Sequence, residues 1–271
     1  MIEFVKYHGT GNDFILINGD LSRVNLKDAD WIRRCCDRRF GIGGNGLIVV
    51  RAHDQTDFEM LYFNSDGRPG SFCGNGGRCA VIFALEEGLF TGKECIFSAY
   101  DGKHEARIDF SGGKVAIRMA DVLSVETGEN FAILDTGSPH YVEWVRDLDY
   151  MNITEAGRAI RYSPRFASEG VNVNFIEEKE DGFLKVATYE RGVEEETLSC
   201  GTGVVASALA SFYLRLPRGD VSQEINVHTR GGTLKVQFVW TEDRFHDIWL
   251  TGPVEFVFSG RLADHPPQIH S

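Results

Sequence analysis

Two cysteines occur in matching contexts in the two halves of the 271-residue chain. The first opens the motif Cys-Gly-Asn-Gly at residues 73–76, and the second opens Cys-Gly-Thr-Gly at residues 200–203. An apolar run with helical character follows each motif, so each thiol is predicted to lie at the N-terminus of a helix. Unpaired N–H groups and the positive end of the helix dipole favour a thiolate there. The pair suggests one substrate held between two sulfurs.

The chemistry that suits two such thiols is inversion at a carbon atom. Disulfide redox chemistry usually uses neighbouring cysteines such as Cys-x-x-Cys, and acyl transfer needs one cysteine with a histidine. Inversion needs a base on one face of the carbon and an acid on the other, which a thiolate and a thiol can supply. Glycines at the first and third positions after each cysteine suit close backbone approach to a ligand and a ring of N–H donors. Packing alone gives no reason for glycine at both positions.

The other four cysteines lie in apolar or helical contexts and are predicted to be structural. They are Cys35, Cys36, Cys79 and Cys95. Cys73 and Cys79 have no matching Cys or His pair downstream, which is a poor zinc pattern, so no metal is expected. The sequence also contains no flavin or pyridoxal-lysine motif, and no cofactor is expected. Six cysteines in a chain of this length do not form a disulfide framework.

The bulk composition is that of a soluble globular protein, with 42% hydrophobic and 25% charged residues. The formal net charge of −12 argues against nucleic acid or an anionic membrane as a partner. No apolar run reaches the length of about 18 residues that predicts a transmembrane helix, and the N-terminus lacks a signal pattern. We therefore expect a cytoplasmic protein that acts on a small molecule.

Both halves predict the same order of elements: strands, a helix, strands, the cysteine motif, a long helix and further strands. In the first half, a glycine-rich turn at 8–13 joins two strands, and a helix is expected at 28–39. In the second half, a helix is expected at 154–161 with Thr154 as its N-cap. Pro217 is predicted to stop the second long helix.

The two long helices are apolar nearly all round, so each is expected to be wrapped by its own sheet. The predicted fold class is therefore α+β, with two pseudo-symmetric domains that each fold a β-sheet around a central α-helix. The domains are expected at residues 1–120, which carry Cys73, and 121–271, which carry Cys200.

With these motifs the chain resembles the diaminopimelate epimerase family over almost its whole length. The matching segments, in the family's order, are 7–14 (Tyr-His-Gly-Thr-Gly-Asn-Asp-Phe), 63–67 (Phe-Asn-Ser-Asp-Gly), 73–79 (Cys-Gly-Asn-Gly-Gly-Arg-Cys), 137–140 (Gly-Ser-Pro-His), 170–175 (Gly-Val-Asn-Val-Asn-Phe), 190–192 (Glu-Arg-Gly), 196–203 (Glu-Thr-Leu-Ser-Cys-Gly-Thr-Gly) and 250–253 (Leu-Thr-Gly-Pro). Proline racemases share the fold and the two thiols, but typically carry a histidine where Asn75 stands.

The resemblance implies cofactor-independent conversion of LL-diaminopimelate to meso-diaminopimelate, in lysine and peptidoglycan precursor biosynthesis. Cys73 and Cys200 would be the acid–base pair, with His140 and Glu190 near the thiols to assist their protonation balance. The resemblance further implies a homodimer, and a segment after Phe258 that crosses back to the first domain.

The resemblance also implies where the substrate binds. The backbone donors that would hold the α-carboxylate are those around Gly74, Asn75, Gly201 and Thr202. Glu190 and the carbonyl of Arg191 would hold the α-ammonium. The groups that would bind the distal end of the substrate are Asn12, Asn64, Asn172 and the guanidinium of Arg191.

Each of these residues also has a purely structural interpretation. Asn12 and Asn64 stand beside glycine-rich turns, where asparagine commonly caps the turn. Arg191 has three acidic neighbours at 194–196 with which it could form a surface ion pair. His140, which follows Ser-Pro, could be an ordinary turn histidine. The motifs in register favour the functional interpretation for all four.

The chain departs from the family's usual pattern in three places. Ser138 replaces an asparagine and is predicted to loosen the distal pocket, Asn45 replaces an aspartate in a loop, and the loop at 68–71 has an unusual composition.

Two alternatives to epimerisation of diaminopimelate remain. One is a racemase of another amino acid on the same scaffold, and the other is a thiol redox or binding protein with a switchable disulfide. Release of tritium or deuterium to water during turnover separates these alternatives.

Overall fold

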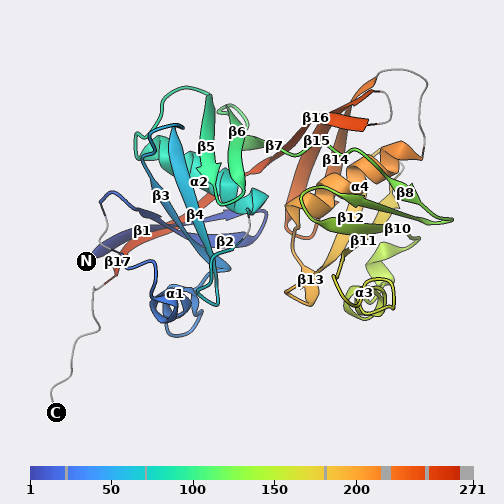
Figure 1. The fold of residues 1–271 in the computed structure, drawn as a ribbon, viewed down its shortest axis with the longest axis horizontal. Helices are drawn as coiled ribbons and strands as arrows, with labels where there is room; N and C mark the ends of the chain where they lie inside the picture. Colours follow the sequence, from blue (N-terminus) through green and yellow to red (C-terminus); the bar gives the residue numbers. More distant parts are fainter. Residues whose placement is uncertain (22–23, 71, 180–181, 215–220, 242–243, 263–271) are drawn as a thin grey trace, which may run out of the picture. The chain divides into compact units, whose positions relative to one another are not determined.

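The computed structural model describes residues 1–21, 24–70, 72–179, 182–214, 221–241 and 244–262. The chain divides into two compact units (Figure 1). Unit 1 consists of Met1–Val115 together with the C-terminal strand β17 (Glu255–Leu262), and unit 2 is Ala116–Pro253. Strand β7 (Lys114–Arg118) contains the boundary between them.

Unit 1 is a mixed sheet that carries two helices. Its other strands are β1 (Ile2–Gly9), β2 (Asn12–Asn18), β3 (Gly46–Arg51), β4 (Phe58–Asn64), β5 (Glu94–Ala99) and β6 (Gly102–Asp109). Helix α1 (Ala29–Cys36) follows β2, and α2 (Gly74–Glu86) follows β4. The pairs β1–β2, β3–β4 and β5–β6 are antiparallel, whereas β2–β3 and β4–β5 are parallel. Strand β17 pairs antiparallel with β1.

Unit 2 repeats this topology. Its strands are β8 (Glu126–Thr127), β9 (Phe131–Asp135), β10 (Pro139–Trp144), β11 (Asn172–Glu178), β12 (Leu184–Glu190), β13 (Glu195–Thr197), β14 (Val221–Thr229), β15 (Gly232–Thr241) and β16 (Arg244–Pro253). The helices are η1 (Leu148–Tyr150), α3 (Ile153–Arg161) and α4 (Gly201–Tyr213). Strands β9, β10, β11, β12, β14 and β15 pair in the same antiparallel and parallel alternation as β1 to β6. The expected α+β fold with two pseudo-symmetric halves is therefore confirmed.

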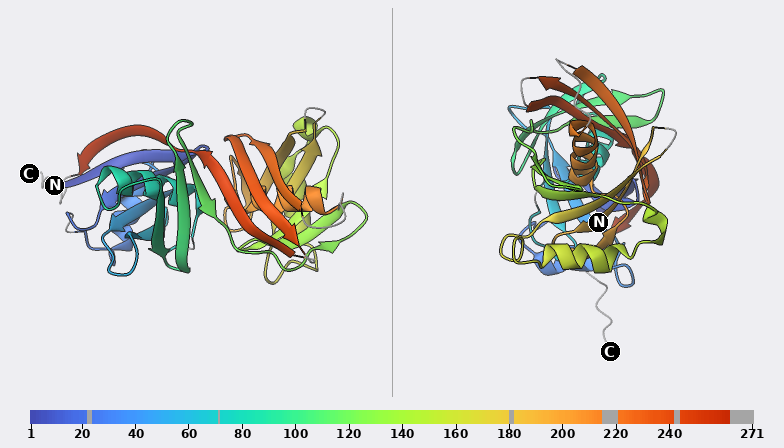
Figure 2. Two further views of the ribbon diagram at one scale, coloured as in Figure 1. Left: turned by 90° about the horizontal axis from the view of Figure 1, so that it is seen from above. Right: turned by 90° about the vertical axis from the view of Figure 1, so that its right-hand side faces the viewer.

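Each sheet wraps around one helix (Figures 1 and 2). Helix α2 packs against β1, β2, β3 and β4, and α4 packs against β9 to β12 and β14 to β16. Most residues of both helices are buried. An apolar helix surface has no favourable contact with water, so enclosure by the sheet is the stable arrangement. The prediction of two enclosed helices is confirmed.

Two of the predicted helix boundaries are wrong. The helix expected at 28–39 ends at Cys36, and its N-cap Asp28 accepts a hydrogen bond from the backbone N–H of Trp31 at 2.9 Å. Thr154 is not the N-cap of α3, because Asn152 accepts the capping hydrogen bond from Glu155 at 3.2 Å. Asparagine is among the preferred N-cap residues, and the N-cap lies two residues earlier than predicted. The predicted stop at Pro217 and residue Ser71 of the 68–71 loop lie outside the described residues.

Candidate active site

Cys73 is the N-cap residue of α2. Its backbone is extended (φ −117°, ψ 116°), its carbonyl accepts the N–H of Gly77 at 2.7 Å, and its side chain makes no capping hydrogen bond. The thiol is partly exposed. The first turn of a helix leaves N–H groups without intrahelical acceptors, and these lie next to the sulfur. Gly74 and Asn75, the predicted carboxylate donors of unit 1, form this turn.

Asn12 reaches Cys73 from the hairpin of β1 and β2. Thr10 and Gly11 both have positive φ (50° and 81°), which is the conformation of a two-residue type I′ turn. The turn places Asn12 at the start of β2, where its amide nitrogen lies 3.7 Å from the sulfur of Cys73. Asn12 was predicted to bind the distal end of the substrate, and its contact with Cys73 was not predicted.

An ion-pair network anchors this hairpin. The carboxylate of Asp13 lies 2.8 Å from Lys6 and 2.7 Å from Arg38, and Lys6 also donates to the carbonyl of Gly43. Burial alone would raise the pKa of Asp13, but hydrogen bonds and charges from Arg38 and Lys6 hold it below the usual value. Asn45 accepts a hydrogen bond from the backbone N–H of Asp13 at 3.2 Å, so its contacts support this loop.

Arg78 is a functional candidate that the sequence analysis missed. Its side chain is fully buried under the first turn of α2 and donates to the amide oxygen of Asn75 at 2.8 Å. Weaker contacts of 3.5 Å join it to the hydroxyl of Thr10 and the carbonyl of Gly74. Desolvation lowers the pKa of Arg78, and negative charge on Cys79 or Cys73 would act in the opposite direction. The sequence did contain a signal for Arg78, because it is a charged residue inside an otherwise apolar helix.

Cys200 is the N-cap residue of α4 and has nearly the same backbone conformation as Cys73 (φ −105°, ψ 113°). Its carbonyl accepts the N–H of Val204 at 2.9 Å, and its side chain is 8% exposed. The hydroxyl of Thr202 lies 3.5 Å from its sulfur. The Thr202 carbonyl in turn accepts a hydrogen bond from Thr136 at 2.9 Å, which fixes the first turn of the helix.

His140 lies in β10, fully buried. Its Nε2 is 3.1 Å from the hydroxyl of Ser138, and its Nδ1 is 3.0 Å from the amide nitrogen of Asn174. Burial lowers the pKa of His140 to about 3, and the positive charge of Arg191 acts in the same direction. The imidazole is therefore neutral at physiological pH. The interpretation of His140 as an ordinary turn histidine does not fit, because it lies in a strand.

Ser138 links several of these groups. Its hydroxyl lies 3.4 Å from the hydroxyl of Thr202 and accepts a hydrogen bond from the amide of Asn172 at 3.2 Å. Ser138 was expected to affect the distal pocket, and its contact with Asn172 fits that expectation. Its contacts with His140 and Thr202 also place it on the route to Cys200, which the sequence did not indicate.

Glu190 and Arg191 lie at the end of β12, beside Asn172. The amide oxygen of Asn172 accepts the backbone N–H of Arg191 at 2.9 Å, and the Arg191 guanidinium donates to the carbonyl of Glu169 at 2.9 Å. Two of the three acidic neighbours of Arg191 are paired elsewhere, Glu194 with Arg161 and Glu196 with Arg230. Burial raises the pKa of Glu190, and the described residues include no cation paired with it. A ligand ammonium would supply the missing charge.

Asn64, Gly201 and the four other cysteines complete the set of residues singled out from the sequence. Asn64 is exposed at the end of β4, and its backbone bonds Arg68 and Gly67 in the following turn. Gly201 is buried in the first turn of α4. The four cysteines predicted to be structural are buried, and burial raises their pKa to about 11 for Cys35 and about 12 for Cys36, Cys79 and Cys95. Such thiols are poor nucleophiles and poor acids at neutral pH.

The third-position glycines have a packing role that the sequence analysis denied. A Cβ atom on Gly203 would lie 2.4 Å from the amide oxygen of Asn174, and one on Gly76 would lie 3.0 Å from Ile48. A side chain at residue 203 would therefore clash with Asn174, whereas one at residue 76 would require Ile48 to shift. Only the first-position glycines, Gly74 and Gly201, remain explained by approach to a ligand.

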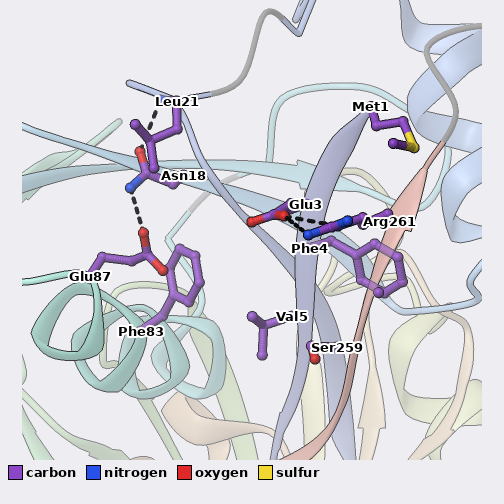
Figure 3. A pocket seen from close by; sticks show the side chains of 11 residues that line it. Met1, Glu3, Phe4, Val5, Asn18, Leu21, Phe83, Glu87, Ser259 and Arg261 are labelled. Atoms are coloured by element: carbon purple, nitrogen blue, oxygen red, sulfur yellow. Dashed lines mark hydrogen bonds and ion pairs between the residues drawn. The ribbon is translucent and has the colours of Figure 1, made fainter.

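A hollow of about 440 Å³ lies beside β1 and β17 in unit 1 (Figure 3). Its lining includes the ion pair of Glu3 with Arg261 at 2.8 Å and the hydrogen bond of Asn18 to Glu87 at 2.6 Å. None of the described residues that line it is a predicted site residue. The hollow is therefore not part of the candidate active site.

Across the described ranges, no cluster of three or more His, Cys, Asp or Glu side chains is arranged to hold a metal ion. No described helix has the length and apolar character needed to cross a membrane.

Known proteins are similar to this chain over almost its whole length. A family model described as diaminopimelate epimerase matches residues 4–129 and again residues 132–257. The diaminopimelate epimerase of Flavobacterium psychrophilum is 41% identical over 257 residues, covering 95% of this chain and 98% of that protein. The diaminopimelate epimerase of Aquifex aeolicus is 37% identical over 281 residues, with coverage of 97% and 98%.

Solved structures show the same fold at low sequence identity. A Bacillus anthracis phenazine biosynthesis protein of the PhzF family has a TM-score of 0.74 at 13% identity, covering 97% of this chain and 99% of that chain. A probable proline racemase from Agrobacterium radiobacter has a TM-score of 0.69 at 16% identity, with coverage of 99% and 95%. The two family-model matches, one in each half, and the identity with full-length relatives show that the chain belongs to the diaminopimelate epimerase family, whose members are isomerases.

Proposed function

We propose that this protein interconverts LL- and meso-diaminopimelate by proton transfer at one α-carbon, without a cofactor, in lysine and peptidoglycan precursor biosynthesis. The observation that carries the proposal is the repeated placement of a thiol. Cys73 and Cys200 each occupy the N-cap of an enclosed helix, with the same extended backbone, in units of the same topology. The names of the similar full-length relatives supply the substrate.

The proposed mechanism uses one sulfur as the base and the other as the acid. A thiolate takes the α-proton, and the electron pair left on carbon delocalises into the α-carboxylate. The second thiol then gives its proton to the opposite face of the carbon, so each turn exchanges the roles of the two sulfurs. N–H groups of Gly74, Asn75, Gly201 and Thr202 would stabilise the charge that develops on the carboxylate.

The groups at the end of β12 support an amino-acid substrate with a second charged end. Glu190 is partly buried without a cation among the described residues, which suits binding of an α-ammonium. Arg191 has no carboxylate partner among the described side chains, although it donates to the Glu169 carbonyl. Asn12, Asn64 and Asn172 add neutral amide donors and acceptors. Burying Glu190 is costly unless it is paired, which favours a role in binding.

Substrate specificity is the direct test of this proposal. Purified protein should release α-hydrogen from LL-diaminopimelate to solvent and form the meso isomer. Amino acids with a single carboxylate, such as proline, should give little exchange. Faster turnover of such an amino acid than of diaminopimelate would assign the protein to a different racemase activity. Absence of exchange from every amino acid tested would instead favour a redox or binding role.

We further propose that the protein works as a cytoplasmic homodimer that uses the exposed face of β17. Three consecutive apolar residues of this strand are exposed: Phe256 by 59%, Val257 by 46% and Phe258 by 42%. Large apolar side chains exposed close together commonly mark a protein interface.

Light scattering after size exclusion tests the dimer. We expect the mass of two chains for the natural protein and of one chain for Phe256→Lys. Phe40→Lys is the matched control, because Phe40 is 89% exposed elsewhere in unit 1. A monomeric natural protein, or a dimer that survives Phe256→Lys unchanged, would contradict this interface.

A further inference from the structure

We propose that Ser138 and Thr202 form a directed hydrogen-bond chain that runs from His140 to Cys200 and holds a donor hydroxyl on its sulfur. The inference rests on the proposed function, because it concerns the thiol that acts as acid or base. His140 Nε2 lies 3.1 Å from Ser138 Oγ. Ser138 Oγ lies 3.4 Å from Thr202 Oγ1, which in turn lies 3.5 Å from Cys200 Sγ.

The first end of the chain has a fixed direction because of Asn174. Its amide oxygen accepts from the hydroxyl of Thr188 at 2.9 Å, and its amide nitrogen donates to the carbonyl of Tyr141 at 3.1 Å. The same nitrogen faces His140 Nδ1 at 3.0 Å. Nδ1 must therefore accept, and a neutral imidazole then carries its single proton on Nε2. That proton points to Ser138.

The middle of the chain has a fixed direction because of Asn172. Its amide oxygen accepts the backbone N–H of Arg191 at 2.9 Å, so its nitrogen donates to Ser138 at 3.2 Å. The Ser138 oxygen thus accepts from both His140 and Asn172. A hydroxyl has two acceptor lone pairs and one proton, so the Ser138 proton is left to donate to Thr202. The Thr202 proton then remains to donate onward to a Cys200 thiolate, at 3.5 Å.

A hydroxyl held as a donor stabilises a thiolate more than a thiol. The chain therefore gives Cys200 a neutral source of stabilisation that does not require His140 to be charged. The printed contact of Cys73 is with the amide of Asn12, at 3.7 Å. Ser138 and Thr202 belong to unit 2 and are positioning residues for Cys200.

Other ionisable groups on neighbouring elements also influence Cys200. They are Asp135 at the end of β9, His140 in β10, Glu190 and Arg191 at the end of β12, and the Glu196–Arg230 ion pair between β13 and the β14–β15 turn. Their charges are the same in each variant below except at the residue that is changed. A difference in the Cys200 midpoint between variants therefore reports the effect of the hydrogen-bond chain.

The test is the pH dependence of iodoacetamide alkylation of the substrate-free protein, followed separately at Cys200 and Cys73 by peptide mass mapping. Thr202→Val removes the donor and should raise the alkylation midpoint of Cys200 by about one to two pH units, the worth of one hydrogen bond to a charged group. Ser138→Ala should raise it by less than about one unit, since polarisation along a chain adds modestly to each bond. Thr202→Ser should restore the natural midpoint.

A second pair of variants tests the source of the chain. His140→Gln keeps an N–H donor and should stay closer to the natural midpoint than His140→Ala. The midpoint of Cys73 should not move in any variant, and thermal unfolding should show that each is folded. A Cys200 midpoint that is unchanged in both Thr202→Val and Ser138→Ala would overturn the proposal. The titration uses no substrate, so its result does not depend on whether the protein acts on diaminopimelate.

Discussion

Cys73 and Cys200 share a backbone conformation but differ in what lies behind them. Five residues into α2 stands Arg78, which is charged and fully buried, whereas the same position in α4 is the buried apolar Val205. The thiol of unit 1 is therefore close to a buried cation, and the thiol of unit 2 is at the end of a neutral hydrogen-bond chain. The two cysteines proposed as acid and base are thus supported by different physical means.

Glu190 provides a test at the scale of one residue. Burial raises its pKa above the value of 4.5 expected in the unfolded chain, so its ionised form is less favourable in the folded state. The resulting loss of stability is absent below pH 4.5 and fully present above the raised pKa. Glu190→Gln should therefore raise the melting temperature at neutral pH, and this gain should disappear at low pH.

The same variant should bind substrate less well. Loss of a hydrogen bond to a charged ammonium is worth about 1.5–3 kcal/mol, or roughly a 10- to 150-fold rise in KM. Melting curves at several pH values and initial rates measure both effects. A variant that melts lower than the natural protein at neutral pH, with KM unchanged, would show that ionised Glu190 stabilises the fold, for example through its hydrogen bond with Thr197, and has no part in binding.

At the scale of elements, the close approach of each central helix to its sheet sets the position of its thiol. Gly203 lies against Asn174, a fixed amide of the sheet, whereas Gly76 lies against the flexible end of Ile48. Replacing glycine by alanine inside a helix gains about 1 kcal/mol of intrinsic helix stability. Overpacking against a rigid neighbour costs about 1–3 kcal/mol. The rigidity of the neighbouring side chain therefore determines whether the gain in helix stability or the cost of overpacking is larger.

This contrast predicts different outcomes for two equivalent substitutions. Gly203→Ala should destabilise the protein by about 1–2 kcal/mol and reduce activity, because Asn174 must move away from His140. Gly76→Ala should change stability by less than about 1 kcal/mol, since Ile48 can adjust its rotamer. Urea unfolding compares the two variants directly. Equal effects from the two substitutions would mean that the packing of Asn174 does not limit the helix.

At the scale of the whole molecule, the sequence predicted the architecture better than the local detail. Repeated motifs and two helices that are apolar all round required two similar units, and the strand pairing confirms them. Strand β10 was not predicted, because Ser138 and Pro139 read as a turn. Proline is tolerated as the first residue of a strand, and pairing with β9 and β11 decides the conformation of residues 139–144.

The same limit applies to the candidate site. The motifs predicted its residue types, and the structure places Asn12 at Cys73 and Asn172 beside Arg191. Pairwise contacts between distant segments could not be read from spacing, so Arg78, Asn174 and the linking role of Ser138 were missed. The packing reason for Gly76 and Gly203 was missed for the same cause. Tertiary contacts, and not local propensity, determine each of these features.

The central claim is that one thiol in each unit takes part in proton transfer at the same carbon. The most direct measurement is epimerisation of LL-diaminopimelate in D₂O by the natural protein, Cys73→Ala and Cys200→Ala, with deuterium at the α-carbon followed by mass spectrometry. The natural protein should form the meso isomer with one solvent deuterium, and each variant should lose about 10²- to 10⁴-fold of the rate, the usual contribution of an acid–base group. Epimerisation by either variant at a rate near that of the natural protein would contradict the claim.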